Sequence, residues 1–416
     1  MLHWIAGHRT CLFLDHNGFR YPEPGFDCLA AAGALEQVEA PAGKAFALLK
    51  EFQNRAGDWI FGHFSYDLKN EMEDLSSRHF DGIGLPDLHW FRPAVVVRLR
   101  GGEAGIGIPG DFEEARRIFQ EICSCPATAS PSLHPGARFS TRMRVQDYLD
   151  RVGSIREHIH VGDCYELNFC RESFCEDISL SPVSLFAELN RISPAPFAAC
   201  YRVGDRWLAC SSPERYLKKS GPRLWSQPIK GTAPRGKDEQ ANARALASFS
   251  SSLKERAENI MTVDLVRNDL SRVAARDTVK AEEICRIEPF AQVFQMISTV
   301  TCQIREGLHP VDAVAATFPM GSMTGAPKVR VMQLIEELET TRRGLYSGAV
   351  GYFDPEGNFD LNVVIRSILY HADSRYLSFH TGSAITFHSD PRQELLECGL
   401  KAAALQQAVT GFRSDP

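Results

Sequence analysis

A lysine in a turn-rich segment is the residue with the clearest capacity for covalent chemistry. Lys230 lies within the nonapeptide PIKGTAPRG, residues 228–236, whose glycines and prolines are typical of turns. A lysine whose pKa is lowered by burial or by a neighbouring cation becomes a nucleophilic amine that can form a covalent intermediate. The alternative is a surface lysine in an ordinary turn, so other parts of the chain must decide.

Two pairs of glutamates are spaced so that each pair shares one helical face. Glu255 and Glu258 lie in a predicted helix over residues 252–273, with Ile260 and Leu270 among its apolar positions. Residues three apart on a helix are neighbours. Each pair therefore presents two carboxylates together, either to solvent or to a cation.

The second pair, Glu394 and Glu397, lies in a predicted helix that Asp390 caps and that has Pro391 at its first position. Both residue types are favoured at helix N-termini. The buried stripe of this helix is expected to comprise Leu395, Cys398, Ala402 and Leu405. Acid pairs on helices are usually solvated surface features, so the surrounding motifs must decide whether these two pairs bind a cation.

A glycine-rich loop precedes another predicted helix. Residues 321–328 read GSMTGAPK and are followed by apolar residues at helical spacing. Backbone N–H groups and the positive end of the helix dipole favour an anion at such a position, and Lys328 adds a formal charge. The spacing differs from that of a nucleotide P-loop, so we expect a site for a different anion or a plain helix cap.

Together these motifs resemble those of chorismate-utilising enzymes. The resemblance is strong over residues 139–410 and rests on PIKGT, the paired glutamates, GSMTGAPK, NVVIRS at 362–367 and TGSAI at 381–385. It is fainter at FGHFSYDL, residues 61–68. The resemblance implies an α+β fold, an anthranilate-synthase-like sandwich of largely antiparallel sheets with external helices.

The resemblance also assigns roles to the matching residues. It implies that Lys230 is the nucleophile, that Arg366 lies in a strand and takes a chorismate carboxylate, and that residues 381–385 form a small-residue turn whose N–H groups meet a carboxylate. The remaining implied catalytic residues are Glu214, Ser322 and Gln295. The implied substrate-binding residues are Thr232, Lys328, Tyr352, Arg366, Gly382, Ser383 and Lys401. The implied magnesium ligands are Glu258 and Glu397, with Glu255 and Glu394 beside them.

Two positions depart from the family pattern. Gln295 stands where many members have a histidine proposed to assist loss of the ring hydroxyl, and glutamine cannot act as a general acid near neutral pH. The hydroxyl must then depend on Mg²⁺, Ser322, another acid or water. Ala384 replaces a usual glycine in TGSAI, which affects only the fine geometry expected there.

Lys230 separates the activities found among these enzymes. Members that form anthranilate or isochorismate usually carry alanine at this position, whereas lysine marks those that convert chorismate and ammonia to aminodeoxychorismate for folate synthesis. The nearest alternative is anthranilate formation. Isochorismate formation is less favoured, because members that activate water carry a lysine where this chain has Glu166. A non-catalytic scaffold is a further alternative, which the intact Lys230 and Glu258 disfavour.

The ammonia is expected to come from a separate glutaminase subunit. The chain ends at Pro416 soon after the last motif and has no Gly-x-Cys-x-Gly nucleophile turn. The net charge of −6 and the lack of a basic block exclude nucleic acid as an expected partner. No signal peptide or stretch of about 20 apolar residues is present, so we expect no membrane association and a cytoplasmic location with reduced, mostly buried cysteines.

The composition suggests three regions. Residues 1–122 alternate short apolar segments with turns and are expected to be strand-rich and part of the same sandwich. Residues 123–138 are rich in proline and small residues, which predicts a loop or linker. Residues 139–416 contain the motifs and form the expected chorismate-binding catalytic region.

Overall fold

A computed structural model describes residues 1–20, 25–125, 133–236, 238–290 and 293–412. Part of the predicted linker, residues 126–132, lies outside these ranges, and Cys123 and Ser124 form the last turn of a helix. Within the described ranges, no helix is long and apolar enough to cross a membrane.

Nineteen strands, counted over the described residues, form one hydrogen-bonded network with antiparallel pairing between neighbouring strands. The strands are β1 (Thr10–Asp15), β2 (Cys28–Ala40), β3 (Ile60–Phe64), β4 (Leu88–Arg100), β5 (Glu103–Gly107), β6 (Ser140–Thr141), β7 (Glu166–Cys175), β8 (Phe197–Val203), β9 (Arg206–Ser212), β10 (Arg215–Ser220), β11 (Arg223–Gln227), β12 (Ile229–Pro234), β13 (Lys280–Pro289), β14 (Val293–Gln303), β15 (Gly325–Ala326), β16 (Ala349–Phe353), β17 (Phe359–Asn362), β18 (Ser367–His371) and β19 (Tyr376–Ile385).

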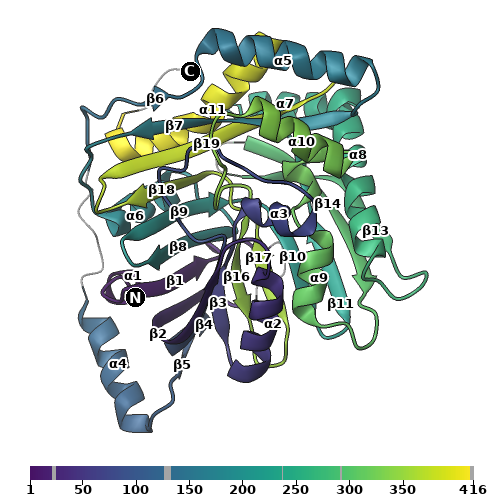
Figure 1. Ribbon diagram of the computed structural model, residues 1–416. Coiled ribbons are helices and arrows are strands. Elements are labelled where there is room, and N and C mark those ends of the chain that lie inside the picture. The colour runs from purple at the N-terminus through teal and green to yellow at the C-terminus, as the bar shows by residue number, and fades with distance from the viewer. Residues whose placement is uncertain (21–24, 126–132, 237, 291–292, 413–416) are drawn as a thin grey trace.

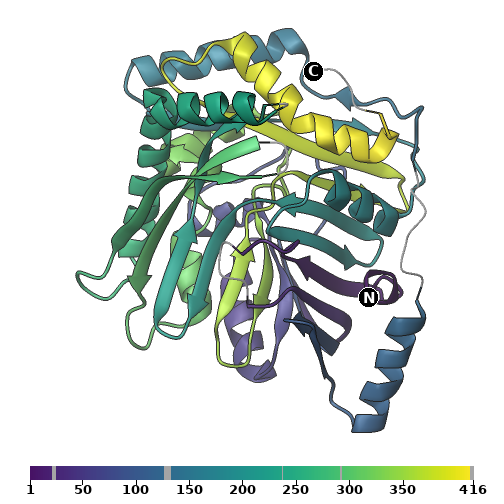
Figure 2. The same ribbon diagram turned by 180° about the vertical axis from the view of Figure 1, so that it is seen from behind.

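The helices lie outside these strands, as Figures 1 and 2 show from opposite sides. They are α1 (Leu2–Ile5), α2 (Ala45–Ala56), α3 (Lys69–Met72), α4 (Phe112–Ser124), α5 (Val145–His160), α6 (Pro182–Ile192), α7 (Glu239–Ser251), α8 (Leu253–Ser271), α9 (Pro310–Thr317), α10 (Lys328–Leu338) and α11 (Pro391–Thr410), with the 3₁₀ turns η1 (Tyr66–Leu68) and η2 (Gly321–Met323). The expected α+β architecture of largely antiparallel strands and external helices is confirmed.

Two large apolar cores hold the helices against the strands. In the first, α2, α8 and α9 pack on β3, β14 and β16 through residues such as Leu49, Val263 and Phe353. In the second, α6 and α11 cover β8, β9 and β19 through residues such as Leu189 and Leu405. Because both cores draw on distant parts of the chain, the helices are fixed relative to the strands that carry the candidate site.

The N-terminal strands are integrated into this network. Strand β1 pairs with β8, placing Phe13 opposite Cys200, and β3 pairs with β16, placing Gly62 opposite Gly351. A side chain on Gly62 would collide with β4, since a Cβ there would lie 2.1 Å from the His89 carbonyl oxygen. Residues 1–122 therefore supply internal strands rather than an appendage.

Two local expectations differ from the structure. Residues 381–385 are not a turn but the end of β19, hydrogen-bonded to β7. Arg366 is not in a strand, because it lies between β17 and β18 with φ +51°. In each case the pairing of distant strands, rather than the local sequence, decides the conformation.

Candidate active site

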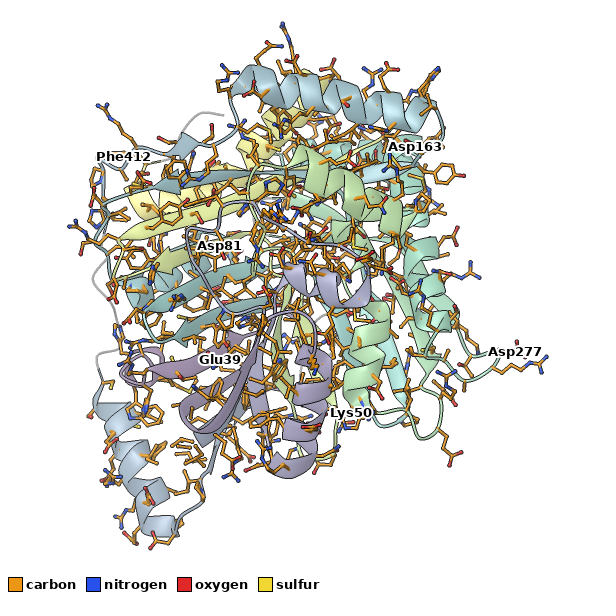
Figure 3. All side chains as sticks on the ribbon, in the orientation of Figure 1. Glu39, Lys50, Asp81, Asp163, Asp277 and Phe412 are labelled. Carbon is orange, nitrogen blue, oxygen red and sulfur yellow. The ribbon has the colours of Figure 1, made fainter. Side chains whose placement is uncertain are left out.

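A buried ion pair between two strands forms the centre of the candidate site. Lys230 on β12 donates from Nζ to Oε1 of Glu166 at the start of β7, over 2.5 Å. Both residues are buried. Figure 3 shows that acids such as Asp163 and Asp277 lie at the periphery of the molecule, so Glu166 differs from them in being enclosed with its cation.

Lys230 does not have the lowered pKa that its sequence context suggested. Burial disfavours its charge, but Glu166, Glu258 and Glu214 more than offset burial, so the Lys230 pKa is raised. The expected activation by burial alone is therefore wrong for this arrangement, because sequence could not show that three carboxylates surround the amine. The raised pKa favours the ammonium form of Lys230.

A second buried acid lies close to the glycine-rich loop. Glu214, between β9 and β10, accepts a hydrogen bond of 2.6 Å from the Ser322 hydroxyl on η2. Burial raises the Glu214 pKa to about 7, although Ser322 and Lys230 oppose the shift. At neutral pH this carboxyl can therefore either hold or accept a proton, which suits a general acid or base.

Helix α8 is tied directly to the lysine strand. Ser252 caps the helix by accepting from Glu255 N, and one turn later Asn259 donates to the carbonyl oxygens of Lys230 and Met296, over 3.2 and 3.1 Å. Asn259 was not among the residues predicted from sequence. Its amide holds the preceding Glu258 at the site.

The four predicted metal ligands come from two helices. The Glu255 pKa is raised by burial and by neighbours that include Glu397 and Glu394, which places the pairs on α8 and α11 close to one another. Burial raises the pKa of Glu258 to about 7. For Glu397, burial is outweighed by Lys401, at 2.6 Å, and its pKa is lowered.

This acid cluster fits a Mg²⁺ ion in its chemistry. Glu258 Oε1 is buried and accepts no hydrogen bond from any described residue, although Lys254 Nζ lies 3.8 Å from it. Among the described residues, no three His, Cys, Asp or Glu side chains converge as a complete protein cage. Mg²⁺ typically uses one or two carboxylates with waters and substrate oxygens, so the chemistry of Glu258 and Glu397 is compatible with such an ion.

Helix α11 begins and packs as its sequence predicts. The Asp390 carboxylate accepts from the N–H groups of Arg392 and Gln393, and Cys398 and Leu405 are buried. Lys401 donates to the Gly382 carbonyl oxygen over 2.7 Å. Lys401 thereby joins Glu397 on α11 to the end of β19.

Arg366 lies near this cluster with its guanidinium uncommitted. It is partly exposed, and it donates no hydrogen bond to any residue in the described ranges. Burial lowers its pKa, while Tyr346 and Glu397 oppose the shift. Its left-handed φ is sparsely populated for a non-glycine residue and is typical of functional sites. A free guanidinium fork suits a ligand carboxylate.

Tyr346, rather than Tyr352, accompanies Arg366. The loop carrying Tyr346 is held against the segment before Arg366, because Ser347 N donates to Val364 O and Val364 N to Gly348 O. Sequence analysis missed Tyr346. The available signal was a tyrosine between Gly344 and Gly348, just ahead of a strand, whereas Tyr352 lies within β16.

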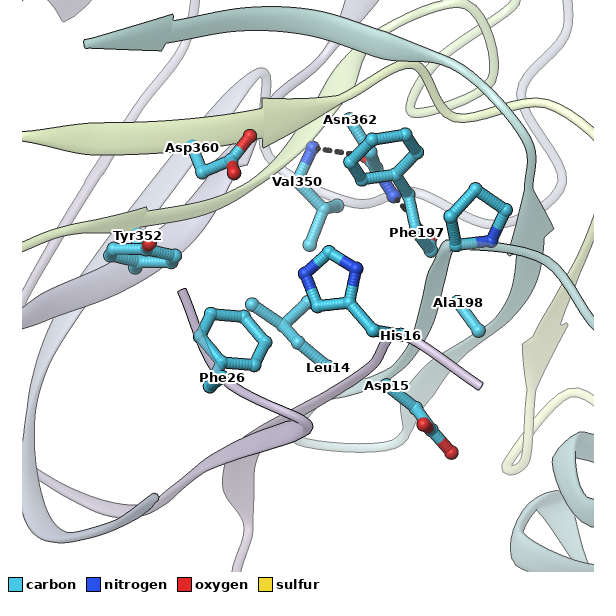
Figure 4. Close-up of a pocket in the computed structure, with 11 residues that line it drawn as sticks. Leu14, Asp15, His16, Phe26, Phe197, Ala198, Val350, Tyr352, Asp360 and Asn362 are labelled. Carbon is cyan, nitrogen blue, oxygen red and sulfur yellow. Dashed lines mark hydrogen bonds between the residues drawn. The ribbon is translucent and has the colours of Figure 1, made fainter. Parts of the chain in front are cut away.

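Tyr352 lines a different pocket. Its ring packs against Phe26 and Phe61, and Figure 4 shows it at the edge of a pocket that also contains His16 and Phe197. The residues that shift its pKa do not include Lys230 or Glu258. The structure does not bring Tyr352 into the acid and lysine cluster.

Other predicted residues lie in varied surroundings. Lys328 donates to Asp269 on α8, over 2.6 Å, and to the Thr317 carbonyl oxygen on α9. Its ammonium group is therefore already paired with protein groups. The Ser383 hydroxyl faces Tyr148 in the interior, and Gly382 leaves no room for a side chain beside Cys170. Thr232 is exposed and lies on β12, two residues after Lys230.

Gln295 is buried on β14, where it lies opposite Thr232 in the strand register. Its Oε1 has no hydrogen-bond partner among the described residues. The Gln295 oxygen can therefore still accept a hydrogen bond, and among the described residues it forms none with Lys230.

A buried arginine connects three segments of the site. Arg343 pairs with Glu339 over 2.6 Å and donates to the carbonyl oxygens of Met323 and Asn168. Met323 follows Ser322, and Asn168 lies two residues after Glu166 on β7. Arg343 thus fixes the glycine-rich loop relative to the strand that carries Glu166. No local motif marked it in the sequence.

Comparison with known proteins assigns the chain to a family. The family model described as chorismate binding enzyme matches residues 16–407. Aminodeoxychorismate synthase of Streptomyces griseus is 44% identical over 261 residues, covering 62% of this chain but only 35% of that protein. Anthranilate synthase component 1 of Thermus thermophilus is 35% identical over 358 residues, covering 84% of this chain and 77% of that one.

A solved structure shares the fold. Anthranilate synthase component I from Streptococcus pneumoniae superposes with a TM-score of 0.80 at 24% identity, covering 91% of each chain. The antiparallel scaffold with external helices is therefore shared with that structure. The chain belongs to the chorismate binding enzyme family.

Proposed function

We propose that this protein is the amination component of an aminodeoxychorismate synthase, converting chorismate and ammonia to 4-amino-4-deoxychorismate in the supply of para-aminobenzoate for folate. The observation that carries the proposal is Lys230, whose amine projects into a buried carboxylate cluster on a strand of the site. A nucleophilic amine at this place permits a covalent route that alanine could not provide. The similarity to the Streptomyces griseus aminodeoxychorismate synthase supports the same assignment.

In this proposal the charge of each residue determines its role. Arg366 takes a substrate carboxylate, with the Tyr346 loop beside it. Glu258 and Glu397 would hold Mg²⁺, which supplies positive charge for the ring carboxylate and relieves repulsion among the acids. Glu214, with its pKa near 7 and its Ser322 contact, donates a proton to the departing ring hydroxyl. This role replaces the family histidine that Gln295 cannot fulfil.

The covalent step follows from the position of Lys230. Its amine bonds to the ring carbon beside the carboxylate-bearing carbon, and the allylic hydroxyl leaves as water with the proton from Glu214. Ammonia then bonds where the hydroxyl was and expels the lysine amine. The enolpyruvyl group is untouched, so no pyruvate is released. The ammonia would come from a separate glutaminase subunit, in a cytoplasmic setting that keeps the buried thiols reduced.

Product identification tests this function. Purified protein with chorismate, ammonium and Mg²⁺ should form aminodeoxychorismate, identified by mass spectrometry, without pyruvate in a coupled lactate dehydrogenase assay. Glutamine should replace ammonium only when a glutaminase subunit is added. Anthranilate synthase is the second candidate because of the Thermus thermophilus relative. Anthranilate with an equal amount of pyruvate would support that candidate and overturn the proposal.

A further inference from the structure

The proposed nucleophile presents a proton problem. Lys230 must attack as a neutral amine, yet the surrounding carboxylates hold it as an ammonium ion. Some group has to take its proton before the carbon–nitrogen bond forms. This requirement rests on the proposed function, in which Lys230 bonds to the substrate.

Glu166 is the group in contact with that proton. It is the one described carboxylate that pairs with Lys230 Nζ, at 2.5 Å. Glu258 and Glu214 act on the lysine at longer range, and neither forms an ion pair with it among the described residues. Glu166 also has a second oxygen, Oε2, that is buried and has no hydrogen-bond partner among the described residues. The carboxylate therefore has an unused site for a proton.

The backbone around Glu166 holds this carboxylate in place. Strand β15 pairs Ala326 with Glu166, and Tyr165 N donates to Ala326 O. Gly325 approaches so closely that a Cβ there would lie 2.0 Å from the Glu166 carbonyl oxygen. Gly325 belongs to the same loop as Ser322. This loop therefore contacts both Glu166, the partner of Lys230, and Glu214, the proposed acid.

We propose that Glu166 is the proton acceptor for Lys230 and sets the position of its amine in the amination reaction. The proton moves from Nζ to a Glu166 oxygen, which breaks an N–H bond and forms an O–H bond. The freed lone pair then forms the carbon–nitrogen bond as the hydroxyl leaves with a proton from Glu214. When ammonia expels the lysine as a neutral amine, Glu166 returns the proton, and the product ammonium restores the proton to Glu214.

A purely electrostatic role for Glu166 makes the opposite prediction. If Glu166 only stabilised the ammonium form, its removal would favour the neutral amine, and the reaction would be unchanged or faster. A proton acceptor, by contrast, cannot be removed without loss of the chemical step. A lost general base typically costs about 10²- to 10⁴-fold in rate.

The test compares Glu166→Gln with a matched control on the same strand. Glu172 is also a buried carboxylate of β7, but it pairs with Arg142 and Tyr376 outside the site. Glu166→Gln should lower kcat for aminodeoxychorismate at least about 10²-fold, change the chorismate KM less than about threefold, and reduce the Lys230 adduct trapped by quenching. Glu172→Gln should retain the wild-type kcat and adduct.

Glu166→Asp provides a second variant that keeps a carboxylate one methylene shorter. It should recover part of the activity lost in Glu166→Gln and therefore tests the chemistry even if the amide variant folds poorly. If the kcat of Glu166→Gln lies within about threefold of the wild-type value, the inference is overturned but the proposed function is not. Failure of the wild type to make aminodeoxychorismate would overturn the proposed function and the inference with it.

Discussion

At the scale of single residues, the site concentrates opposing charges in a small buried volume. Lys230 lies among carboxylates that raise its pKa, while burial raises the pKa values of Glu214 and Glu258 to about 7. These shifts place two carboxyls near the protonation balance at neutral pH. Perturbed ionisation of this kind is typical of catalytic sites.

Removing the proposed nucleophile is the most direct residue-scale prediction. Lys230→Ala should lower amination by about 10²-fold or more, because the covalent route is lost while Arg366 still binds the substrate. Wild-type protein quenched during turnover should carry a mass adduct at Lys230 that the variant lacks. Aminodeoxychorismate formation by the variant at the wild-type rate would show that Lys230 takes no part in the chemistry.

The Glu214 pKa predicts a dependence of stability on pH. A carboxyl whose pKa is higher in the folded than in the unfolded state stabilises the fold below its unfolded pKa, and this contribution is lost as pH rises through the folded pKa. Without Mg²⁺, the free energy of unfolding should therefore fall between about pH 4.5 and about pH 7. Glu214→Gln should flatten this fall by on the order of 1–3 kcal/mol in urea unfolding. An identical pH slope in the variant would contradict the raised pKa.

At the scale of elements, two helices carry the proposed metal-binding acids beside the lysine strand. Helix α8 is attached through Asn259, which bonds to the Lys230 and Met296 carbonyls and accepts from the Ser298 hydroxyl over 2.5 Å. Helix α11 is attached through Lys401 at Gly382. The positions of Glu258 and Glu397 therefore depend on contacts made by their helix neighbours.

Asn259→Ala tests this attachment. Loss of these buried hydrogen bonds leaves their partners unsatisfied and should reduce the free energy of unfolding by on the order of 2–4 kcal/mol. It should also raise the Mg²⁺ concentration needed for half-maximal activity, because Glu258 is no longer held. Asn268, exposed near the end of the same helix, is the control, and Asn268→Ala should stay within about 0.5 kcal/mol of wild type. Equal effects of both variants would rule out a specific role for Asn259.

At the scale of the whole molecule, the N-terminal strands and the motif-bearing region form one hydrogen-bonded network. Strands β1 and β3 pair with β8 and β16, which lie far along the chain. The second of these, β16, follows the loop of Tyr346. The N-terminal region therefore supports a part of the site to which it contributes no predicted catalytic residue.

Separating the two regions should abolish folding. A fragment of residues 139–416 would expose the edges of β8 and β16 and the apolar faces that pack on β2 and β4, and exposed edges of this kind promote aggregation. It should show no cooperative urea transition by circular dichroism, whereas co-expression with residues 1–138 should restore a folded, active complex. Cooperative unfolding of the fragment alone would indicate that residues 139–416 form an independent domain.

Local patterns predicted a substantial part of this structure. The helix start at Asp390, the buried stripe of α11 and the strand character of Ala349–Phe353 follow from caps and periodicity between near neighbours. The fold class followed from the motif order, and the family match agrees with it. Local signals failed at Arg366 and residues 381–385, where distant strands determine the backbone.

The sequence by itself determined which chemical groups are present and which helices carry them, since residue type and spacing along a helix are local properties. Tertiary structure alone decided which groups meet. The packing of distant elements brought Glu166 to Lys230 across 64 positions, directed Lys328 to Asp269, and placed Tyr346 rather than Tyr352 beside Arg366. The physical reason is that strand register and core packing set contacts between distant residues, and these contacts also determine whether a buried amine is charged.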